Sequence, residues 1–526
     1  MGGSMRAFRW IAGVSLIACA ASSAQAETLR EALVRAYSSN PQLTGERANL
    51  RATDEGVPLA RASGLPQLSA DGSYSENVLN TANNSIAQPQ RTAAAGVNLS
   101  VPLYSGGAVR NSVRAAERRV EAGRANLRSV EANVFTQVVA AYNDVLRDEA
   151  IVRLNQQNLR VLEVNLQASR DRFEVGDLTR TDVAQSEARL ASAQSQLRSA
   201  EAQLITSREN YVEVTGAPPG TLAPPPELPN LPGNPQGAVS VAVDNNPSLQ
   251  AAQRESDAAG FDVRVARASR LPRVAAVSGG SYSTVLNSIP DINGIRISPD
   301  GASVTAGLQL SVPLFQGGGP AAQVRRAQAV ESSAIERVTQ VERAVVSDAR
   351  SAFAAWQSSL RVIESSEVQV SANRLSLEGV RAENSVGTRT ILDILNAEQE
   401  LLNSQVQLVS ARRDAYVAGF ALLAAMGRAE AQDLGLDGGA LYDPTTNYSR
   451  VRNRIWDWDS DPAPKPVATT TVGTPAQTPV VTRELEPELR HDVNPYGITD
   501  RADAANRRGG DAATRPVDTN RANPDS

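Results

Sequence analysis

Two very long stretches without proline constrain the fold of this chain more than any other feature: residues 103–217 and residues 321–443. Within the first stretch, residues 108–173 and 179–214 carry apolar side chains at spacings of three and four, which is typical of one face of an α-helix. Frequent Ala and Ser elsewhere allow close packing between helices. A helix over residues 108–173 would be roughly 100 Å long, at ~1.5 Å per residue. The sequence therefore predicts long, coiled-coil-like helical hairpins.

Short phrases occur twice along the chain, in the same order. The phrase "LSVPLYSGG" at residues 99–107 returns as "LSVPLFQGG" at 310–318, and "NPQL" at 40–43 returns as "NPSL" at 246–249. The interval between the two copies of each phrase is far longer than the repeat length of solenoid proteins. In both copies an Asn precedes the Pro, which is typical of a helix start. The sequence therefore predicts an internal duplication.

These observations divide the chain into six parts. The predicted parts are a signal peptide at 1–26, a first repeat at 27–215, a Pro-rich linker at 216–237, a second repeat at 238–427, a segment at 428–460 beside the middle of the helices and a disordered tail at 461–526. Disorder is expected in the tail because it is rich in Pro, Thr, Asp and Arg and poor in large apolar residues. Just before it, Trp456 and Trp458 are expected to pack on the middle of the helical region, the alternative being that they are free of it.

Each repeat also contains two strand-like runs. In the run 97–103 the apolar residues alternate with Asn98 and Ser100, and the run 304–314 alternates in the same way. Weaker partner runs cover 67–75 and 273–283. A soluble sandwich and a transmembrane barrel both fit such alternation. Four strands cannot close a barrel with a usable lumen, so a membrane-spanning form would need several chains, and three chains would give 12 strands.

The N-terminus has the features of an export signal. Arg6 and Arg9 precede a short apolar stretch, and Ala24 to Ala26 form a small-x-small cleavage signal that predicts a mature start at Glu27. The alternative is a lipobox ending at Cys19, the only cysteine, which would then be acylated. Either processing route exports the protein from the cytoplasm.

Composition gives no indication of catalysis. The net charge of −5 is too mild to suggest a nucleic-acid partner, and the only histidine is His491, in the tail. Cleavage after Ala26 would leave no cysteine for nucleophilic catalysis or for soft metal sites. The glycines at 317–319 are not followed by the Lys and Ser or Thr of a phosphate-binding loop. We therefore expect no enzyme activity, no cofactor and no metal.

The combined motifs resemble the TolC family of outer-membrane channel-tunnels. The resemblance covers about residues 28–445 and rests on "NPxL", "PL[YF]xGG" and "VGTRTxLD" together. It implies an α+β membrane protein: a homotrimer with a 12-stranded outer-membrane β-barrel, four strands per chain, continued by a long periplasmic α-helical tunnel. It also implies a periplasmic adaptor protein and an inner-membrane pump, either an ABC transporter or a proton-driven one. The stretch 442–458 resembles members that serve type I secretion, which favours protein export over drug efflux.

The resemblance also assigns roles to both ends of the repeat. Pro102 and Pro313 would lie at strand exits, where a missing ladder donor is tolerated. Glycine pairs would make the turns from strand into helix, since glycine adopts the required backbone conformation. These pairs are Gly106 with Gly107 and Gly317 with Gly318. The phrases "VGDLTRTDV" and "VGTRTILDI" would form hairpin tips at the periplasmic mouth. The tip residues expected to contact the adaptor are Val175, Gly176, Leu178, Val386, Gly387 and Thr388.

At these tips the family pattern implies a latch and a constriction. Arg389 would reach Thr181 and Asp182 of the neighbouring chain, and Asp393 would form a ring of three carboxylates that selects cations. Asn396 would line the same constriction. This chain has Asn396 where members usually have a second aspartate, and Asn384 where many have a tyrosine. The ring is therefore expected to be weaker, and one link of the latch is expected to be absent.

Alternatives remain open at this point. Asp182 and Arg389 could simply cap and solvate a helical turn. The whole chain could be a coiled-coil scaffold, either periplasmic or at the surface, or held by a lipid on Cys19. The sequence favours a passive export duct, because long coiled coils joined to barrel-like strands behind a signal peptide are a rare combination.

Overall fold

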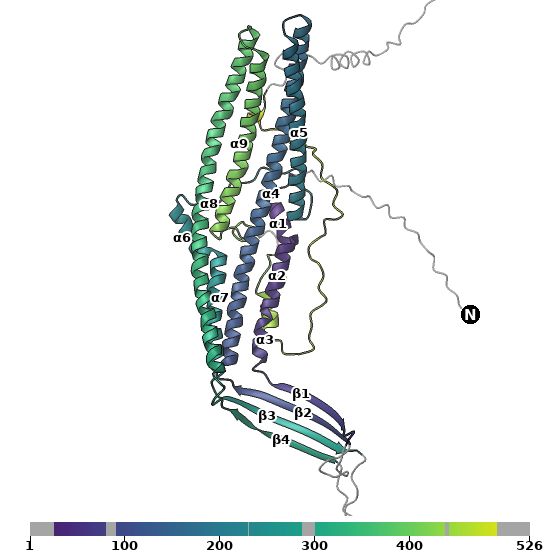
Figure 1. Cartoon of the computed structure of the whole chain (residues 1–526), viewed down its shortest axis with the longest axis vertical. Helices are drawn as coiled ribbons and strands as arrows, with labels where there is room; N and C mark the ends of the chain where they lie inside the picture. Colours follow the sequence, from purple (N-terminus) through teal and green to yellow (C-terminus); the bar gives the residue numbers. More distant parts are fainter. Residues whose placement is uncertain (1–25, 80–90, 230, 287–299, 437–440, 492–526) are drawn as a thin grey trace, which may run out of the picture.

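The computed structural model describes residues 26–79, 91–229, 231–286, 300–436 and 441–491. Residues 1–25 of the predicted signal peptide, Cys19 among them, lie outside these residues, and so does the end of the tail beyond residue 491. The described chain is a long bundle of helices with one sheet at its end (Figure 1). The predicted combination of long helices and four strands is confirmed.

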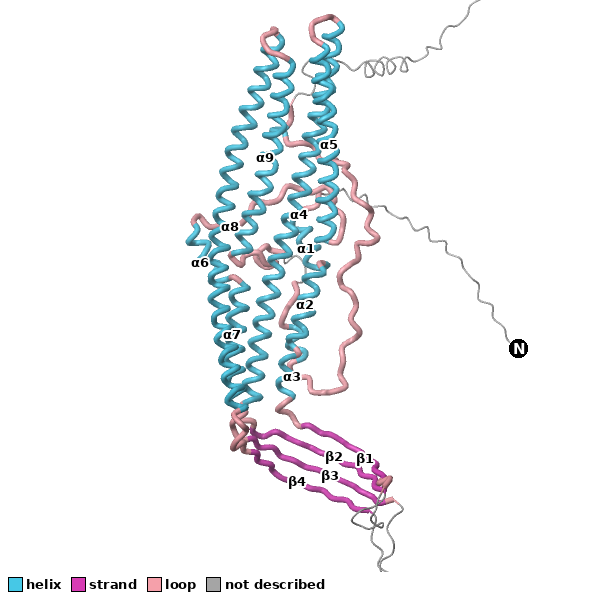
Figure 2. Tube along the Cα trace, in the orientation of Figure 1, coloured by secondary structure: helices cyan, strands magenta, loops and turns pink. Residues whose placement is uncertain are grey.

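The two halves of the chain follow the same order of helices, two strands and a long helical hairpin, with one more short helix in the first half (Figure 2). The first half has α1 (Leu29–Ser39), α2 (Pro41–Asp54), α3 (Gly56–Ala62), β1 (Gln67–Glu76), β2 (Arg91–Tyr104), α4 (Ala108–Glu174) and α5 (Arg180–Thr215). The second half has α6 (Pro235–Asn245), α7 (Pro247–Ala268), β3 (Arg273–Val285), β4 (Asp300–Ser311), α8 (Gly319–Ser385) and α9 (Ile391–Ala425). The helices α4 and α8 each have 67 residues. This correspondence is what a duplicated sequence would produce.

Local sequence signals explain where the helices begin. Asn40 caps α2 by accepting hydrogen bonds from the backbone N–H groups of Gln42 and Leu43. Asn246 caps α7 in the same way, with Pro247 in the first helical position. These contacts satisfy N–H groups that have no partner inside the helix. The "NPxL" phrase is therefore a helix start in both halves.

The sheet is antiparallel in the order β1-β2-β3-β4. Leu68 pairs with Leu99 on one face, and Ser69 pairs with Asn98 on the other. Hydrogen bonds join polar side chains across the second face, as between Asn98 and Asp71 at 3.0 Å. On the first face the apolar side chains project into open space, with Val304 83% and Leu308 74% exposed. This pattern of one apolar and one polar face confirms the alternation seen in the sequence.

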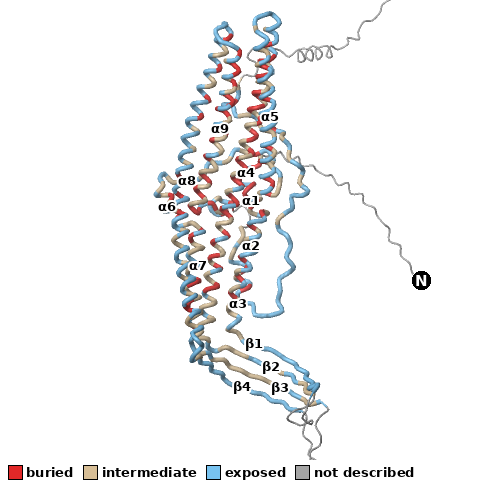
Figure 3. Tube along the Cα trace, in the orientation of Figure 1, coloured by how far each residue is buried: buried red, intermediate tan, exposed pale blue. Residues whose placement is uncertain are grey.

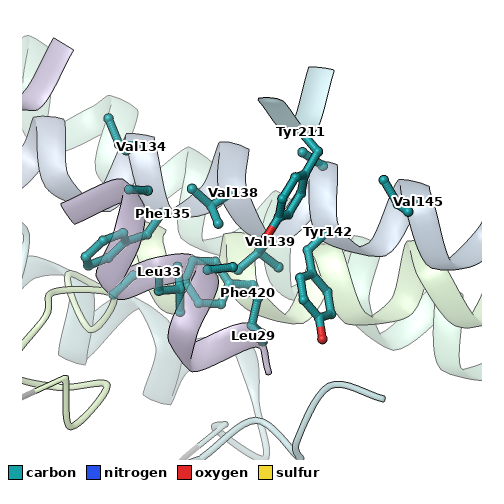
Figure 4. Close-up of a cluster of buried hydrophobic side chains, with 14 of the residues drawn as sticks. Leu29, Leu33, Val134, Phe135, Val138, Val139, Tyr142, Val145, Tyr211 and Phe420 are labelled. Carbon is teal, nitrogen blue, oxygen red and sulfur yellow. The ribbon is translucent and has the colours of Figure 1, made fainter. Parts of the chain in front are cut away.

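The largest hydrophobic core lies where α1 and α5 meet α4 (Figures 3 and 4). Phe135 and Tyr142 of α4 pack there with Tyr211 of α5, and all three are fully buried. The Tyr142 hydroxyl donates to the backbone carbonyl of Glu27 at 2.9 Å, while that of Tyr211 donates to the Glu27 carboxylate at 2.7 Å. Glu27, the predicted start of the mature chain, is thus fixed in the middle of the bundle.

The C-terminal part differs from what the sequence indicated. The short helix α10 (Thr446–Val451) is held on α2 by a hydrogen bond from Asn447 to the buried Asp54, at 2.8 Å. Trp456 and Trp458 are 72% and 87% exposed, so within this chain they do not pack on the middle of the helical region. Between Asp461 and residue 491, the last one described, the chain lacks regular structure apart from a short 3-10 helix at Pro487–Leu489. Residues 477–491 nevertheless lie against the long helices, where the sequence indicated disorder.

Among the described residues, no helix is long and apolar enough to cross a membrane.

Candidate functional site

The two helical hairpins end in turns of the same design, at the end of the bundle opposite the sheet (Figure 1). Gly176 follows α4 with φ +81°, and Gly387 follows α8 with φ +83°. Glycine reverses the chain here because other residues rarely adopt positive φ. In the second turn the N–H of Thr388 returns to the carbonyl of Glu383 at 3.0 Å. The "VGDLT" and "VGTRT" phrases therefore form the hairpin tips, as the sequence predicted.

A capping box begins the second helix of each hairpin. Thr179 and Asp182 exchange hydrogen bonds at the start of α5, and Thr390 and Asp393 do the same at the start of α9. The Asp393 carboxylate accepts from the Thr390 N–H at 3.0 Å and from its hydroxyl at 2.8 Å. These bonds favour the charged form. They hold the pKa of Asp182 and of Asp393 below the usual value for an aspartate.

The capping boxes show that both aspartates have a structural role within their own chain. This is the alternative that the sequence left open for Asp182. This capping role leaves each aspartate available for the predicted pore contacts. The capping hydrogen bonds engage only Oδ2 of each carboxylate, so Oδ1 is not used by the cap. Both aspartates remain charged at the tips, within a turn of the candidate adaptor contacts.

The tip surface offers apolar and backbone groups for contact. Val175 and Val386 are largely exposed, and Gly176, Gly387 and Thr388 beside them are exposed as well. Leu178 is half-buried. The structure therefore places the six candidate adaptor contacts together on the two turns.

Arg389 has a partner within its own chain. Its Nε donates to Oε2 of Glu383 at 2.7 Å, across the turn from α8. Thr181 and Asp182 lie on the other hairpin, at the start of α5. The latch between neighbouring chains stays a prediction, because it concerns a contact between two protomers. Sequence reasoning missed Glu383, although its position six residues before Arg389 in a predicted turn could have indicated the pair.

Two asparagines join the hairpins directly. Arg172 of α4 donates to Oδ1 of Asn384 on α8 at 3.3 Å, and Arg189 of α5 donates to Oδ1 of Asn396 on α9 at 2.7 Å. Asn384 also donates to the backbone carbonyl of Arg389 at 2.8 Å. The sequence identified both asparagines only as departures from the family pattern. In the structure they are acceptors for arginines on the other hairpin.

A buried carboxylate lies further from the tips. Glu398 of α9 is 2% exposed and forms an ion pair with Arg381 of α8. Burial raises the pKa of Glu398, while Arg381 opposes that shift. His491 at the end of the described chain lies nearby, with its Nε2 3.7 Å from Oε2 of Glu398. Sequence reasoning missed this cluster, since its members are scattered along the chain.

The residues of the predicted strand exits lie at the other end of the bundle, beside the sheet. Pro102 lies near the end of β2, beside an irregularity in the pairing with β3, and Pro313 lies just past the end of β4. Gly107 and Gly318 precede α4 and α8 with φ +81° and +79°. Gly106 also has a positive φ, and a Cβ there would lie 2.8 Å from Cβ of Leu271. Gly317 has φ +58°.

Within the described residues, no group of three or more His, Cys, Asp or Glu side chains could hold a metal ion. The arrangement at the tips consists of caps, cross-hairpin hydrogen bonds and exposed turns. Such an arrangement can hold two hairpins together or let them part.

Comparison with known proteins agrees with this geometry. The family model described as "Outer membrane efflux protein" matches the chain twice, at residues 32–217 and 238–428. The chain is 34% identical to outer membrane efflux protein BepC of Brucella suis over 82% of this chain and 92% of that protein. It is 29% identical to alkaline protease secretion protein AprF of Pseudomonas aeruginosa, over 56% and 61% of the two chains.

A solved structure shares the fold. The outer membrane protein VceC of Vibrio cholerae superposes with a TM-score of 0.64 over 76% of this chain and 96% of that chain, at 22% identity. The two family matches together cover most of the two halves described above. This chain belongs to the outer membrane efflux protein family.

Proposed function

We propose that three copies of this chain form one passive export duct through the outer membrane and the periplasm. Family membership makes the chain an outer-membrane channel protein whose helices extend into the periplasm. The observation that carries the proposal is the sheet, whose apolar face is exposed in the single chain while its other face is polar. An exposed apolar face of this kind suits contact with lipid, and a polar face suits a water-filled lumen.

The edges of the sheet support a shared barrel. β1 and β4 are the edge strands of a four-stranded sheet. An open edge in a lipid bilayer would leave backbone groups without hydrogen-bond partners. Pairing β4 of one chain with β1 of the next removes every edge. Three chains of four strands then give 3 × 4 = 12 strands, which is within the usual range for such barrels.

We assign the closed end of the duct to the hairpin tips. Arg389 would reach Thr181 and Asp182 of the neighbouring chain with the guanidinium N–H groups that Glu383 does not use. Asp393 would face the axis, where three carboxylates would form a cation-selective constriction with Asn396 beside it. The lowered pKa of Asp393 supports this role, since the ring must stay charged.

The energy for export would come from partners. A periplasmic adaptor would engage the exposed turns around Val175 and Val386, and an inner-membrane pump would deliver the substrate. A relative named for protease secretion supports a type I secreted protein as substrate, and one named for efflux supports small molecules. We favour protein secretion, with small-molecule efflux as the second candidate. In a scaffold that does not span a membrane, the exposed apolar face of the sheet would have no lipid to contact.

The proposal is tested with purified mature protein in detergent and in planar bilayers. We expect a trimer that resists dissociation in detergent until it is heated, and discrete conductance steps on insertion. A folded, helical protein that remains monomeric and never inserts would overturn the proposal.

A further inference from the structure

The C-terminal segment 477–491 crosses from one hairpin to the other. We call this segment the strap. It begins beside α5, where the N–H of Gln477 donates to Glu209 at 3.1 Å, and ends beside α4 and α9 at His491. The strap therefore contacts helices of both halves of the chain, between the mid-bundle core and the tips.

The first part of the strap is held by arginines of the first hairpin. Arg208 of α5 donates to the backbone carbonyls of Thr478 and Val480, the latter at 3.0 Å. Arg153 of α4 donates to the carbonyls of Val481 and Arg483, the latter at 2.9 Å. Because carbonyl groups are the acceptors, these bonds hold an extended backbone with little demand on its side chains.

The second part of the strap is held by the second hairpin. Gln405 of α9 donates to the carbonyl of Leu489 at 3.0 Å, and Arg374 of α8 donates to the carbonyl of Glu488. Arg412 of α9 forms ion pairs with the carboxylates of Glu486 and Glu488 at 2.7 and 3.0 Å.

Leu489 is the apolar anchor of the strap. It is 2% exposed and packs in the cluster that joins Leu154 and Leu162 of α4 to Leu401 and Leu408 of α9. A pocket of about 230 Å³ remains between α4, α9 and the strap around Leu485. Leu489 thus anchors the strap, while the pocket that Leu485 and Leu489 line leaves this part of the strap incompletely packed, as expected of a segment that can leave its place.

We propose that the strap holds the two hairpins together in the closed channel and must leave α8 and α9 before the tips can open. Nearer the tips, the side-chain hydrogen bonds between the two hairpins in the described part of the chain are those of Arg172 with Asn384 and of Arg189 with Asn396. The strap adds contacts on both hairpins at a level where α4 and α9 must separate if the tips part. This inference rests on the proposed function, because it assumes that the tips are the gate.

The test compares two truncated proteins. One ends at residue 476 and lacks the strap, and its matched control ends at residue 491 and keeps it. Nitroxide labels are placed on Asp177→Cys and Ser385→Cys, one in each tip, and Cys19 is the only native cysteine. Labelled subunits are diluted with unlabelled ones so that distances within one protomer dominate.

We expect the protein that ends at 476 to show longer distances between the labels and a higher single-channel conductance than the control. A synthetic peptide of residues 477–491 should reverse both changes. Leu489→Gln in the full chain should shift distance and conductance in the same direction, with an unchanged helical circular dichroism spectrum. Because this variant keeps the full chain, a change in it cannot be explained by an effect of truncation on folding.

If the distances between the labels are the same in the two truncated proteins and in Leu489→Gln, the proposal that the strap holds the hairpins together is overturned. Failure of the proposed function gives a different result, because no variant would then conduct while the distances could still change. If every variant conducts and neither the label distances nor the conductance steps change, the proposed duct is supported and the proposed role of the strap is wrong.

Discussion

Arg189 on α5 donates a hydrogen bond of 2.7 Å to Oδ1 of Asn396 on α9. The bond connects the second helix of one hairpin to the second helix of the other, one turn beyond Asp393. It therefore couples the candidate constriction to the first hairpin. A neutral amide accepts from a guanidinium here, whereas a carboxylate would form a stronger bond in which both partners are charged.

The variant Asn396→Asp should make the constriction tighter and more cation-selective. The new carboxylate would pair with Arg189 more strongly than the amide does, and in a trimer it would add a second ring of negative charge. We expect a lower single-channel conductance and a reversal potential shifted toward that of the cation in a salt gradient. Asn403→Asp is the matched control, because it adds the same charge to the same helix two turns further from the tip. Equal effects of the two substitutions would contradict the assignment of Asn396.

Arg389 has two candidate partners, Asp182 of the neighbouring chain and Glu383 of its own chain, and their variants should differ in conductance. If Arg389 reaches Asp182 of the neighbouring chain, the double variant Arg389→Ala with Asp182→Ala should raise the conductance. The variant Glu383→Ala, which removes the partner within the chain, should have little effect. The reverse ranking would assign the closing contact to the pair within the chain and refute the latch between chains.

The strand exits predict a ranking of two glycine substitutions. Gly106 and Gly317 both have positive φ, so an alanine at either costs roughly 1–3 kcal/mol of backbone strain. At Gly106 the new Cβ would also lie 2.8 Å from Cβ of Leu271 and 3.1 Å from the carbonyl of Ala268, whereas at Gly317 nothing lies within 4 Å. Overpacking of this kind typically costs a further ~1–3 kcal/mol.

We therefore expect Gly106→Ala to lower the melting temperature of the detergent-solubilised protein more than Gly317→Ala does. Thermal unfolding followed by circular dichroism measures the difference. A larger loss in Gly317→Ala would show that the turn before α8, and not the one before α4, is the more tightly constrained.

Glu430 predicts a dependence of stability on pH. Burial raises its pKa from 4.5 to about 7, with Asp433 and Glu131 acting in the same direction and Arg128 against it. The folded protein therefore prefers the protonated carboxyl. The stabilisation is fully present below about pH 4.5 and is lost as the pH rises through about 7.

The variant Glu430→Gln, which is neutral at every pH, should lose less stability than the parent between pH 5 and pH 8. Melting temperatures at the two pH values provide the measurement. Glu255→Gln, on an exposed part of α7, is the control and should behave like the parent. Identical losses in the parent and in Glu430→Gln would rule out Glu430 as the titrating group.

The helices and turns could be predicted because their signals are local. The predicted helix over residues 108–173 is Ala108–Glu174 in the structure, since the absence of proline and the spacing of apolar residues decide it. The glycines at 176 and 387 end the helices for a reason confined to a few residues. The capping boxes at Thr179 and Thr390 have an equally local signal, a Thr followed three residues later by an acid.

The contacts between distant segments could not be predicted in the same way. Arg172 and Asn384 are 212 residues apart, and nothing in either local sequence selects the other as partner. The strap was expected to be disordered because its composition is polar. Its docking depends on few apolar residues, such as Leu489, and on arginines that bind backbone carbonyls. Every residue has a backbone carbonyl, so the sequence does not indicate which of them accept these hydrogen bonds. Only the folded structure shows which carbonyls do so.

The most direct test of the proposed closed trimeric duct is the block of single-channel current by hexamminecobalt(III), a trivalent cation, added on the tip side. The account predicts small conductance steps in the parent that the cation blocks. Asp393→Asn should abolish the block, and Asp182→Asn, which changes the same capping position in the other hairpin, should retain it. Conductance that the cation does not block in the parent, or equal block in both variants, would contradict a carboxylate ring at Asp393.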